Sequence, residues 1–120
     1  MEKVYVTWRI FSIYVLVILL MLFAGNAFSQ IQVAQFNAEW NKTNEVTWIN
    51  KLEDCETISY VDINTQKEMQ KTHKIAVIPT IIIFKDDVEV ARFQADLSFK
   101  MVATREEVQE EINDQLMSDF

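Results

Sequence analysis

The chain has 120 residues, of which 50% are hydrophobic, and a formal net charge of −7. This length allows one domain with a modest core, and the acidic balance excludes nucleic acid as an expected partner, because phosphates are bound mainly by Lys and Arg. The whole sequence holds one cysteine and one histidine, so we expect no zinc site and no cofactor.

Residues 1–29 have the pattern of an export signal. Lys3 and Arg9 give a basic start, Ile10–Ala24 is apolar, and small residues follow this stretch. Small side chains at these places favour cleavage after Ser29 or two residues earlier, and we prefer Ser29. The sequence therefore predicts a signal peptide over residues 1–29 and a periplasmic or secreted domain over residues 30–120.

The alternative for this segment is an uncleaved membrane anchor. Val4–Ala24 approaches the ~20 apolar residues that span a bilayer, although Arg9 lies inside this window. An uncleaved anchor is the only membrane contact that we expect for this chain.

The first half of the domain predicts strands and helices in alternation. Apolar residues recur at strand spacing in two stretches, Ile31–Ala38 and Thr57–Ile63. A polar break at Asn41–Asn44 favours a helix cap, and the apolar residues after it lie at helical spacing as far as Leu52, which predicts one short helix of about ten residues. Thr65 and Glu68 form a capping-box pattern, which predicts a second helix ending near Lys74.

The only proline opens the longest apolar run of the domain. Pro79 lacks a backbone N–H and therefore belongs at the start of a strand, and Ile81–Phe84 after it predicts a strand buried on both faces. A second strand, Val88–Phe93, follows after Asp86 and Asp87, which predicts a β-hairpin. The expected domain has no glycine, so we expect Asn or Asp, such as these two residues, wherever φ is positive.

The C-terminal part predicts an extended segment and a helix. Leu97, Phe99 and Met101 alternate with polar residues, and we expect this row to pack internally, as an added edge beside the last strand, rather than to meet a partner. Thr104 and Glu107 form a second capping box before an amphipathic helix. The order β-α-β-α-β-β-α predicts an α/β fold with one four-stranded mixed sheet and helices on both faces, in which strands joined through a helix are parallel.

This order and several motifs resemble the thioredoxin family over about residues 31–96. Phe36-Asn37-Ala38-Glu39-Trp40 is similar to the family's F-x-A-x-W, and Tyr60-Val61-Asp62-Ile63-Asn64 to its second core strand. Ile78-Pro79-Thr80 and Phe84-Lys85-Asp86 are similar to its cis-proline loop and hairpin. The resemblance implies a thioredoxin-like fold with a cis peptide bond before Pro79.

The family's redox residues are missing as a set. Its Cys-x-x-Cys, where a helix N-terminus lowers the pKa of the first thiol, aligns with Asn41, Lys42, Thr43 and Asn44. Its buried acid aligns with Gln35, its helix-kinking proline with Ile49 and its hairpin glycine with Asp87. The resemblance therefore implies a redox-inactive domain.

We expect a non-catalytic module that binds an extended peptide or a partner protein. In the family, backbone groups just before the cis-proline pair with a peptide, and this pairing needs no thiol. The expected groove is lined by Trp40, Asn41, Lys42, Thr43, Asn44, Val77, Ile78 and Pro79. The structural alternative is that Asn41–Asn44 only cap a helix and that Trp40 only packs.

The alternative function is a thiol-disulfide oxidoreductase, with a role in redox homeostasis, that works through Cys55 alone. Three acidic neighbours, Glu53, Asp54 and Glu56, disfavour a thiolate, and Cys55 lies far along the chain from Asn41. A thiol without a catalytic role is buried, free or paired with another molecule. We expect His73, the only histidine, to pack the second helix onto the sheet rather than to bind a metal.

Overall fold

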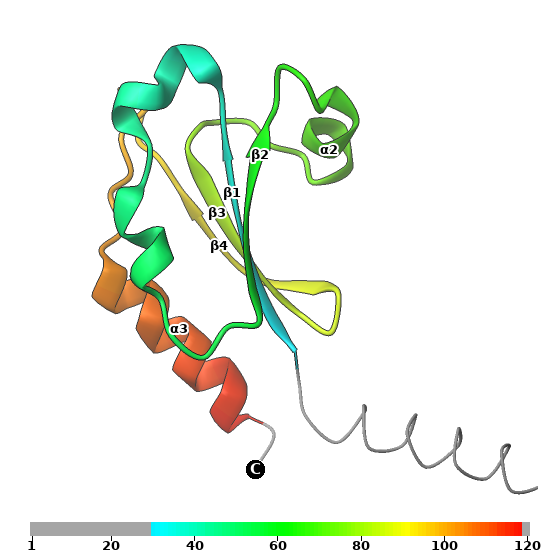
Figure 1. Ribbon diagram of the computed structural model, residues 1–120, viewed down its shortest axis with the longest axis vertical. Helices are drawn as coiled ribbons and strands as arrows, with labels where there is room; N and C mark the ends of the chain where they lie inside the picture. Colours follow the sequence, from blue (N-terminus) through cyan, green and yellow to red (C-terminus); the bar gives the residue numbers. More distant parts are fainter. Residues whose placement is uncertain (1–29, 119–120) are drawn as a thin grey trace, which may run out of the picture.

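A computed structural model describes residues 30–118, so the expected export signal, residues 1–29, and residues 119–120 lie outside the described part (Figure 1). The elements are β1 Ile31–Asn37, η1 Glu39–Asn44, η2 Thr47–Lys51, β2 Thr57–Asp62, α2 Lys67–Thr72, β3 Thr80–Lys85, β4 Val88–Gln94 and α3 Arg105–Met117, where η1 and η2 are 3₁₀ helices. Within residues 30–118, no helix is both long enough and apolar enough to cross a membrane.

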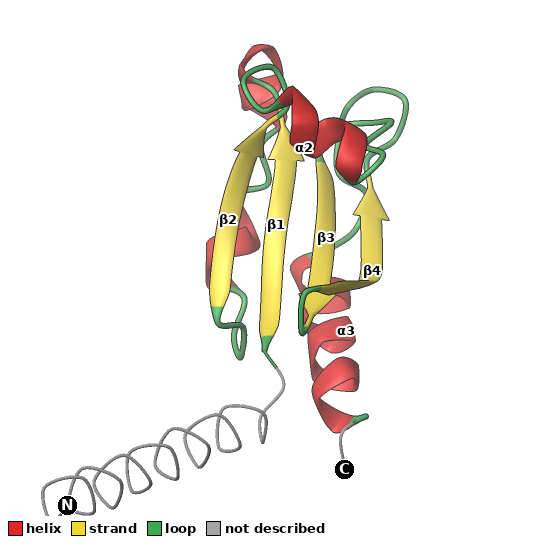
Figure 2. Ribbon diagram, turned by 90° about the vertical axis from the view of Figure 1, so that its right-hand side faces the viewer, coloured by secondary structure: helices red, strands yellow, loops and turns green. Residues whose placement is uncertain are grey.

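The strands form one four-stranded sheet in the order β2-β1-β3-β4. β1 pairs with β2 in parallel, and the β1–β3 and β3–β4 pairs are antiparallel. In Figure 2, α2 crosses one end of the sheet in front of the strands, and α3 lies behind them. The expected mixed sheet with helices on both faces is confirmed.

The predicted direction of β3 was wrong. β2 and β3 are joined through α2, yet β3 runs opposite to β1 and therefore also opposite to β2. The placement of α2 accounts for this difference, because the helix lies across the end of the sheet where β2 finishes (Figure 2) and does not run back along the strands. Its six residues span only about 9 Å, whereas a six-residue strand spans about 20 Å. β3 therefore starts at that same end and runs back.

Each face of the sheet has its own apolar core. On the α3 face, Ile81 and Ile83 of β3 pack with Val108 and Ile112 of α3, and all four are fully buried. On the α2 face, Phe36 and Ile82 pack with residues of the loop after α2. Each such side chain stabilises the fold by about 1.5–3 kcal/mol relative to an exposed one.

The predicted helix after β1 is instead two short 3₁₀ helices, η1 and η2. Between them Glu45 and Val46 are extended, with ψ of 137° and 100°. The side chain of Gln35 accepts a hydrogen bond from the Val46 N–H at 2.8 Å and donates to the Val46 carbonyl at 3.2 Å. Because both backbone groups of Val46 are bound to a neighbouring strand, they are withheld from a continuous helix.

One predicted helix cap is confirmed and the other was wrong. The Thr104 side chain accepts a hydrogen bond from the Glu107 N–H at 3.2 Å, so the capping box before α3 forms. Thr65 caps nothing, because its hydroxyl donates to the Asp62 carbonyl at 3.2 Å, and α2 begins after Gln66 without a side-chain cap. The turn that ends β2 therefore takes the hydroxyl that the sequence pattern assigned to the helix.

Positive φ falls partly where the sequence predicts. Asp86 and Asp87 at the hairpin tip have φ of 51° and 68°, as expected for Asp in place of glycine. Asp54 also has positive φ, but so do Lys74 and Phe99, which are neither Asn nor Asp and were not predicted.

Residues 97–102 do not form the predicted extended row. Phe99 has φ of 64°, and its N–H donates to the Asp96 carbonyl at 3.1 Å, so the segment is a tight turn closed by one isolated bridge between Ala95 and Met101. Met101 packs against the α3-face core, whereas Leu97 is 92% exposed. The apolar row is therefore divided, with one side chain packed internally and another left in solvent.

Candidate functional site

The candidate site lies where β1 ends. η1 begins there, and the turn formed by residues 96–101, which follows β4, lies against it through Phe99. In Figure 1 the orange segment that contains this turn runs beside the cyan and green η1 and η2 before it enters α3. The Ala95 N–H donates to the Pro79 carbonyl at 3.0 Å, which joins the turn to the proline loop.

Asn41 stands at the place of the family's first cysteine and is locked into a buried amide network. Its Nδ2 donates to the Asn37 side-chain oxygen at 3.1 Å and to the Phe99 carbonyl at 3.3 Å, and the Asn37 Nδ2 donates to the Asn41 carbonyl at 3.3 Å. Asn41 is 4% exposed. This position holds the elements together and offers no nucleophile.

The other three positions of the motif are more open. Asn44 donates from its Nδ2 to the Asn41 Oδ1 at 2.9 Å, so the first and last positions face each other as the two cysteines of the family would. Lys42 and Thr43 are exposed. Of the four predicted groove residues at this turn, only these two present free side chains to a ligand.

Trp40 is the most prominent side chain of the site. It is 61% exposed, and its ring meets the ring of Phe99 edge-on, with centroids 5.2 Å apart and planes at 88°. Phe99 is itself 40% exposed. Two adjoining exposed aromatic rings form an apolar surface of the kind that anchors peptides, and the amide network holds the backbone of Phe99 through its carbonyl.

The proline loop contributes backbone rather than side chains. The Ile78–Pro79 peptide bond is cis, as the resemblance implies. Ile78 and Pro79 are buried, whereas Val77 is half-buried and Ala76 is exposed. Within residues 30–118, the N–H groups of Ala76 and Val77 make no hydrogen bond, so they are available to an added strand.

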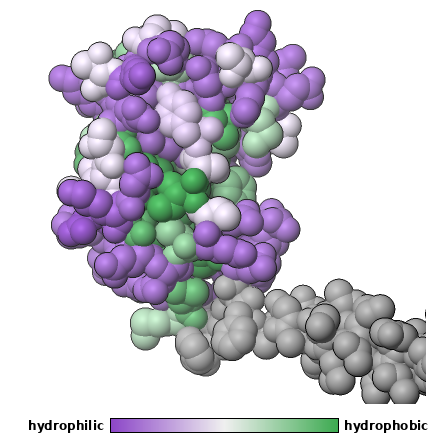
Figure 3. All heavy atoms as spheres, viewed as in Figure 1, coloured by the Kyte–Doolittle hydropathy of each residue, from purple (hydrophilic) through white to green (hydrophobic). Residues whose placement is uncertain are grey.

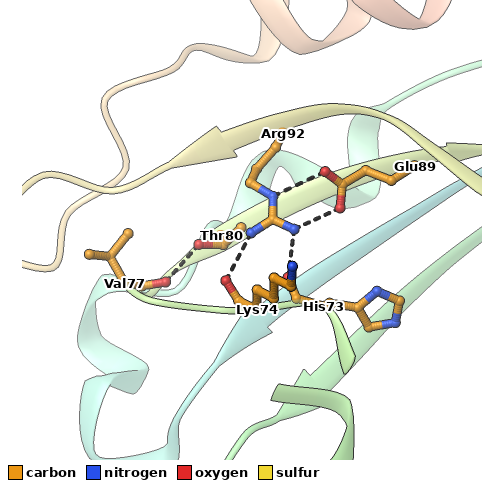
Figure 4. Close-up of polar contacts among 6 residues, drawn as sticks. All are labelled: His73, Lys74, Val77, Thr80, Glu89 and Arg92. Carbon is orange, nitrogen blue, oxygen red and sulfur yellow. Dashed lines mark hydrogen bonds and ion pairs between the residues drawn. The ribbon is translucent and has the colours of Figure 1, made fainter. Parts of the chain in front are cut away.

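Side chains on β3 and β4 hold this loop (Figure 4). Arg92 of β4 donates to the His73 carbonyl at 2.6 Å and to the Lys74 carbonyl at 3.2 Å, and its guanidinium pairs with Glu89 at 2.7 Å. Farther along, the Thr80 hydroxyl donates to the Val77 carbonyl at 2.6 Å. The loop is therefore held at its start and at its end.

Replacing Arg92 with Ala is expected to lower the free energy of unfolding by about 1–3 kcal/mol, because two carbonyls lose a charged donor. Arg105→Ala is the matched control, since its pair with Glu106 is solvent-exposed and is expected to contribute less than about 1 kcal/mol. Urea denaturation of both variants measures the difference. Equal losses would show that Arg92 does not hold the loop.

His73 packs between two aromatic rings. Its ring centroid lies 5.5 Å from that of Phe36 and 5.3 Å from that of Phe84, which is the packing role that the sequence predicts. Within residues 30–118, no group of three or more His, Cys, Asp or Glu side chains is arranged to hold a metal ion.

Cys55 lies at the opposite end of the sheet from Asn41. The N–H of the next residue, Glu56, donates to the Ile31 carbonyl at the start of β1, whereas Asn41 follows the end of that strand, about 20 Å away. Cys55 is half-buried and packs against the α3-face core. Burial, and secondarily the charge of Asp54, raises its pKa above the ordinary value for a thiol. This environment disfavours the reactive thiolate.

Sequence reasoning missed three residues that shape the site. Asn37 sits inside an apolar strand, where a lone buried amide signals a polar partner. The alternation of side chains along β4 places Arg92 on the α2 face of the sheet, so this residue could have been found from the sequence pattern. Phe99 could not have been found, because no sequence pattern predicts positive φ at an aromatic residue.

The fold and the site together define a thioredoxin-fold domain without the Cys-x-x-Cys pair. A scan against models of known protein families finds no match, and a search of curated proteins finds none either. Solved thioredoxin structures do match.

Three of these matches illustrate the likeness. Thioredoxin-2 of the malaria parasite, described as a component of its protein secretion machinery, is 20% identical, with a TM-score of 0.58 over 72% of this chain and 84% of that one. Thioredoxin pre-protein of Schistosoma mansoni is 18% identical, with a TM-score of 0.56 over 79% and 88%. A mutant thioredoxin of Halobacterium salinarum is 14% identical, with a TM-score of 0.57 over 72% and 75%. At these identities the likeness shows the fold.

Proposed function

We propose that this chain is an exported, redox-inactive binding module that holds an extended segment of a partner protein beside the proline loop. The observation that carries the proposal is the exposed Trp40–Phe99 pair, at the same end of the sheet as the unpaired N–H groups of Ala76 and Val77. Backbone pairing supplies affinity for any extended segment, and the aromatic surface favours an apolar side chain in it.

Several features support binding rather than catalysis. The first motif position is a buried amide with its hydrogen bonds satisfied, and Cys55 is remote from it with a raised pKa. A redox role through Cys55 alone would need a mixed disulfide with no second thiol of this chain to resolve it. The alternative oxidoreductase therefore lacks a specific supporting observation.

Export is part of the proposal and is supported by the basic, apolar and small-residue regions of residues 1–29. Sequencing the N-terminus of the protein recovered outside the cytoplasm tests it. A product that begins at Gln30 is expected, and retention of Met1 would favour the anchor.

Replacing Trp40 with Ala is expected to weaken binding of extended apolar peptides about 30-fold, because a central aromatic anchor typically contributes about 2 kcal/mol. Binding of immobilised peptides to the chain, as cells process it, measures the effect. Met117→Ala is the control, since Met117 is also an exposed apolar residue, 68% exposed, on α3. Unchanged affinity in Trp40→Ala would refute the aromatic anchor.

A further inference from the structure

The two edges of the sheet differ in how they are protected. On the β4 edge, a register shift occurs between Ile83 and Phe84, the charges of Arg92 and Glu89 lie along the strand, and the Ala95–Met101 bridge covers its end. Bulges, charged side chains and covering segments are the devices by which proteins prevent strand addition.

The β2 edge has no bulge, and within the described residues no segment pairs with its outer side. Its sequence, Thr57–Asp62, reads TISYVD, without Lys, Arg or Pro, and it pairs regularly with β1 along its whole length. The outer side of β2 therefore offers about 20 Å of backbone donors and acceptors.

Apolar surface accompanies this edge. Tyr60 is 42% exposed and Ile58 is half-buried beside the α3-face core. Figure 3 shows green, apolar atoms emerging over β2 and its flank in the middle of a mostly polar face. An added strand would cover this surface while its backbone pairs with β2.

The charges around the edge are of one sign. Leu52–Gln66 contains four acidic residues and no basic one: Glu53, Asp54, Glu56 and Asp62. The carboxylates of Glu45, Asp62 and Glu39 all act on the Tyr60 phenol and, after burial, raise its pKa. This electrostatic environment favours a cationic segment and opposes a second copy of this acidic chain.

We propose that the outer edge of β2 binds an extended, basic segment of a partner protein as a fifth strand. This edge is a second surface, built from different residues than the Trp40–Phe99 pair, and does not depend on binding there. Lys or Arg residues at the ends of the segment meet the acidic rim, and alternating apolar side chains cover Ile58 and Tyr60.

One substitution isolates the backbone contribution. The Ile63 N–H donates to the Asn37 carbonyl of β1, so in the parallel register of β1 and β2 the Ser59 N–H also points toward β1, whereas the Tyr60 N–H points outward. Tyr60→Pro removes this outward donor without removing a β1 bond, and proline is tolerated on sheet edges. Tyr60→Ala also lacks the ring but keeps the donor, and it is the matched control.

The probe is a synthetic peptide with Val and Thr in alternation and two Lys residues at each end, titrated into the chain as cells process it. Tyr60→Pro is expected to bind this peptide about tenfold more weakly than Tyr60→Ala. Should Tyr60→Pro unfold, Glu39→Lys with Glu56→Lys provides the second test and is expected to reverse the preference between Lys-ended and Glu-ended peptides.

Three results would overturn the proposal. The first is equal binding of the peptide to folded Tyr60→Pro and Tyr60→Ala variants. The second is equal affinity of the wild-type chain for Lys-ended and Glu-ended peptides. The third is a dimer that Tyr60→Pro dissociates and Tyr60→Ala does not, which would assign the edge to a second copy.

Discussion

Replacing Gln35 with Leu is expected to lower the free energy of unfolding by about 2–4 kcal/mol, because two buried backbone groups lose their partners. Gln35 is 2% exposed and Val46 is 5% exposed, so water does not readily replace the lost amide. The change corresponds to a fall in melting temperature of roughly 10–30 °C for a domain of this size.

Gln32→Leu is the control for this experiment. Gln32 lies on the same strand, faces the other side of the sheet and is only half-buried, so its replacement is expected to change stability by less than about 0.5 kcal/mol. Thermal unfolding followed by circular dichroism measures both variants. Similar melting temperatures for the two would show that the bond between Gln35 and Val46 does not stabilise the break between η1 and η2.

Replacing Asn41 and Asn44 with Cys, in a Cys55→Ser background, is expected to yield a chain that forms an internal disulfide on oxidation. The two side chains already meet at 2.9 Å, and residues three apart stack in a 3₁₀ helix. Titration of free thiols before and after oxidation measures the bond, and the expected change is from two thiols per chain to none.

The control pair is Asn41→Cys with Thr43→Cys, two positions apart. Residues at this spacing do not face each other in a 3₁₀ helix, so these thiols are expected to remain free under the same oxidation. A folded Asn41→Cys/Asn44→Cys variant that keeps both thiols would show that residues 41–44 do not have the geometry of the family's active-site turn.

The sequence predicted the elements that local pattern determines. The run after Pro79, the two aspartates of the hairpin and the capping box at Thr104 each act within a few residues, so their structure follows from local chemistry. The resemblance added the fold, because the motifs around Trp40 and Pro79 belong to one arrangement of strands.

One error arose where a distant side chain intervened. The spacing after Asn44 is helical, but Gln35, which lies eleven residues before Val46, binds both backbone groups of Val46 and divides the helix. This bond cannot be detected in a short window of sequence, because it depends on how β1 is placed. The capping box at Thr65 failed for a local reason, because its hydroxyl donates to the Asp62 carbonyl three residues earlier.

The candidate site also combines residues that local motifs predicted with one residue that only the fold brings close. Trp40 and the proline loop followed from motifs, but Phe99 comes from a turn 58 residues beyond Asn41, the residue it contacts. The alternation of residues 97–101 suggested a straight segment, and positive φ at Phe99 turns its ring toward Trp40 instead. The aromatic surface on which the proposed function rests therefore became visible only in three dimensions.

The most direct test of the proposed function is to map the backbone amides that respond when an extended apolar peptide is titrated into the isotopically labelled chain. Binding beside the proline loop predicts that the Val77 amide and the Trp40 indole shift together, with the same affinity in a Cys55→Ser variant. Shifts confined to the surroundings of Cys55, or binding that Cys55→Ser abolishes, would contradict a redox-inactive peptide-binding module.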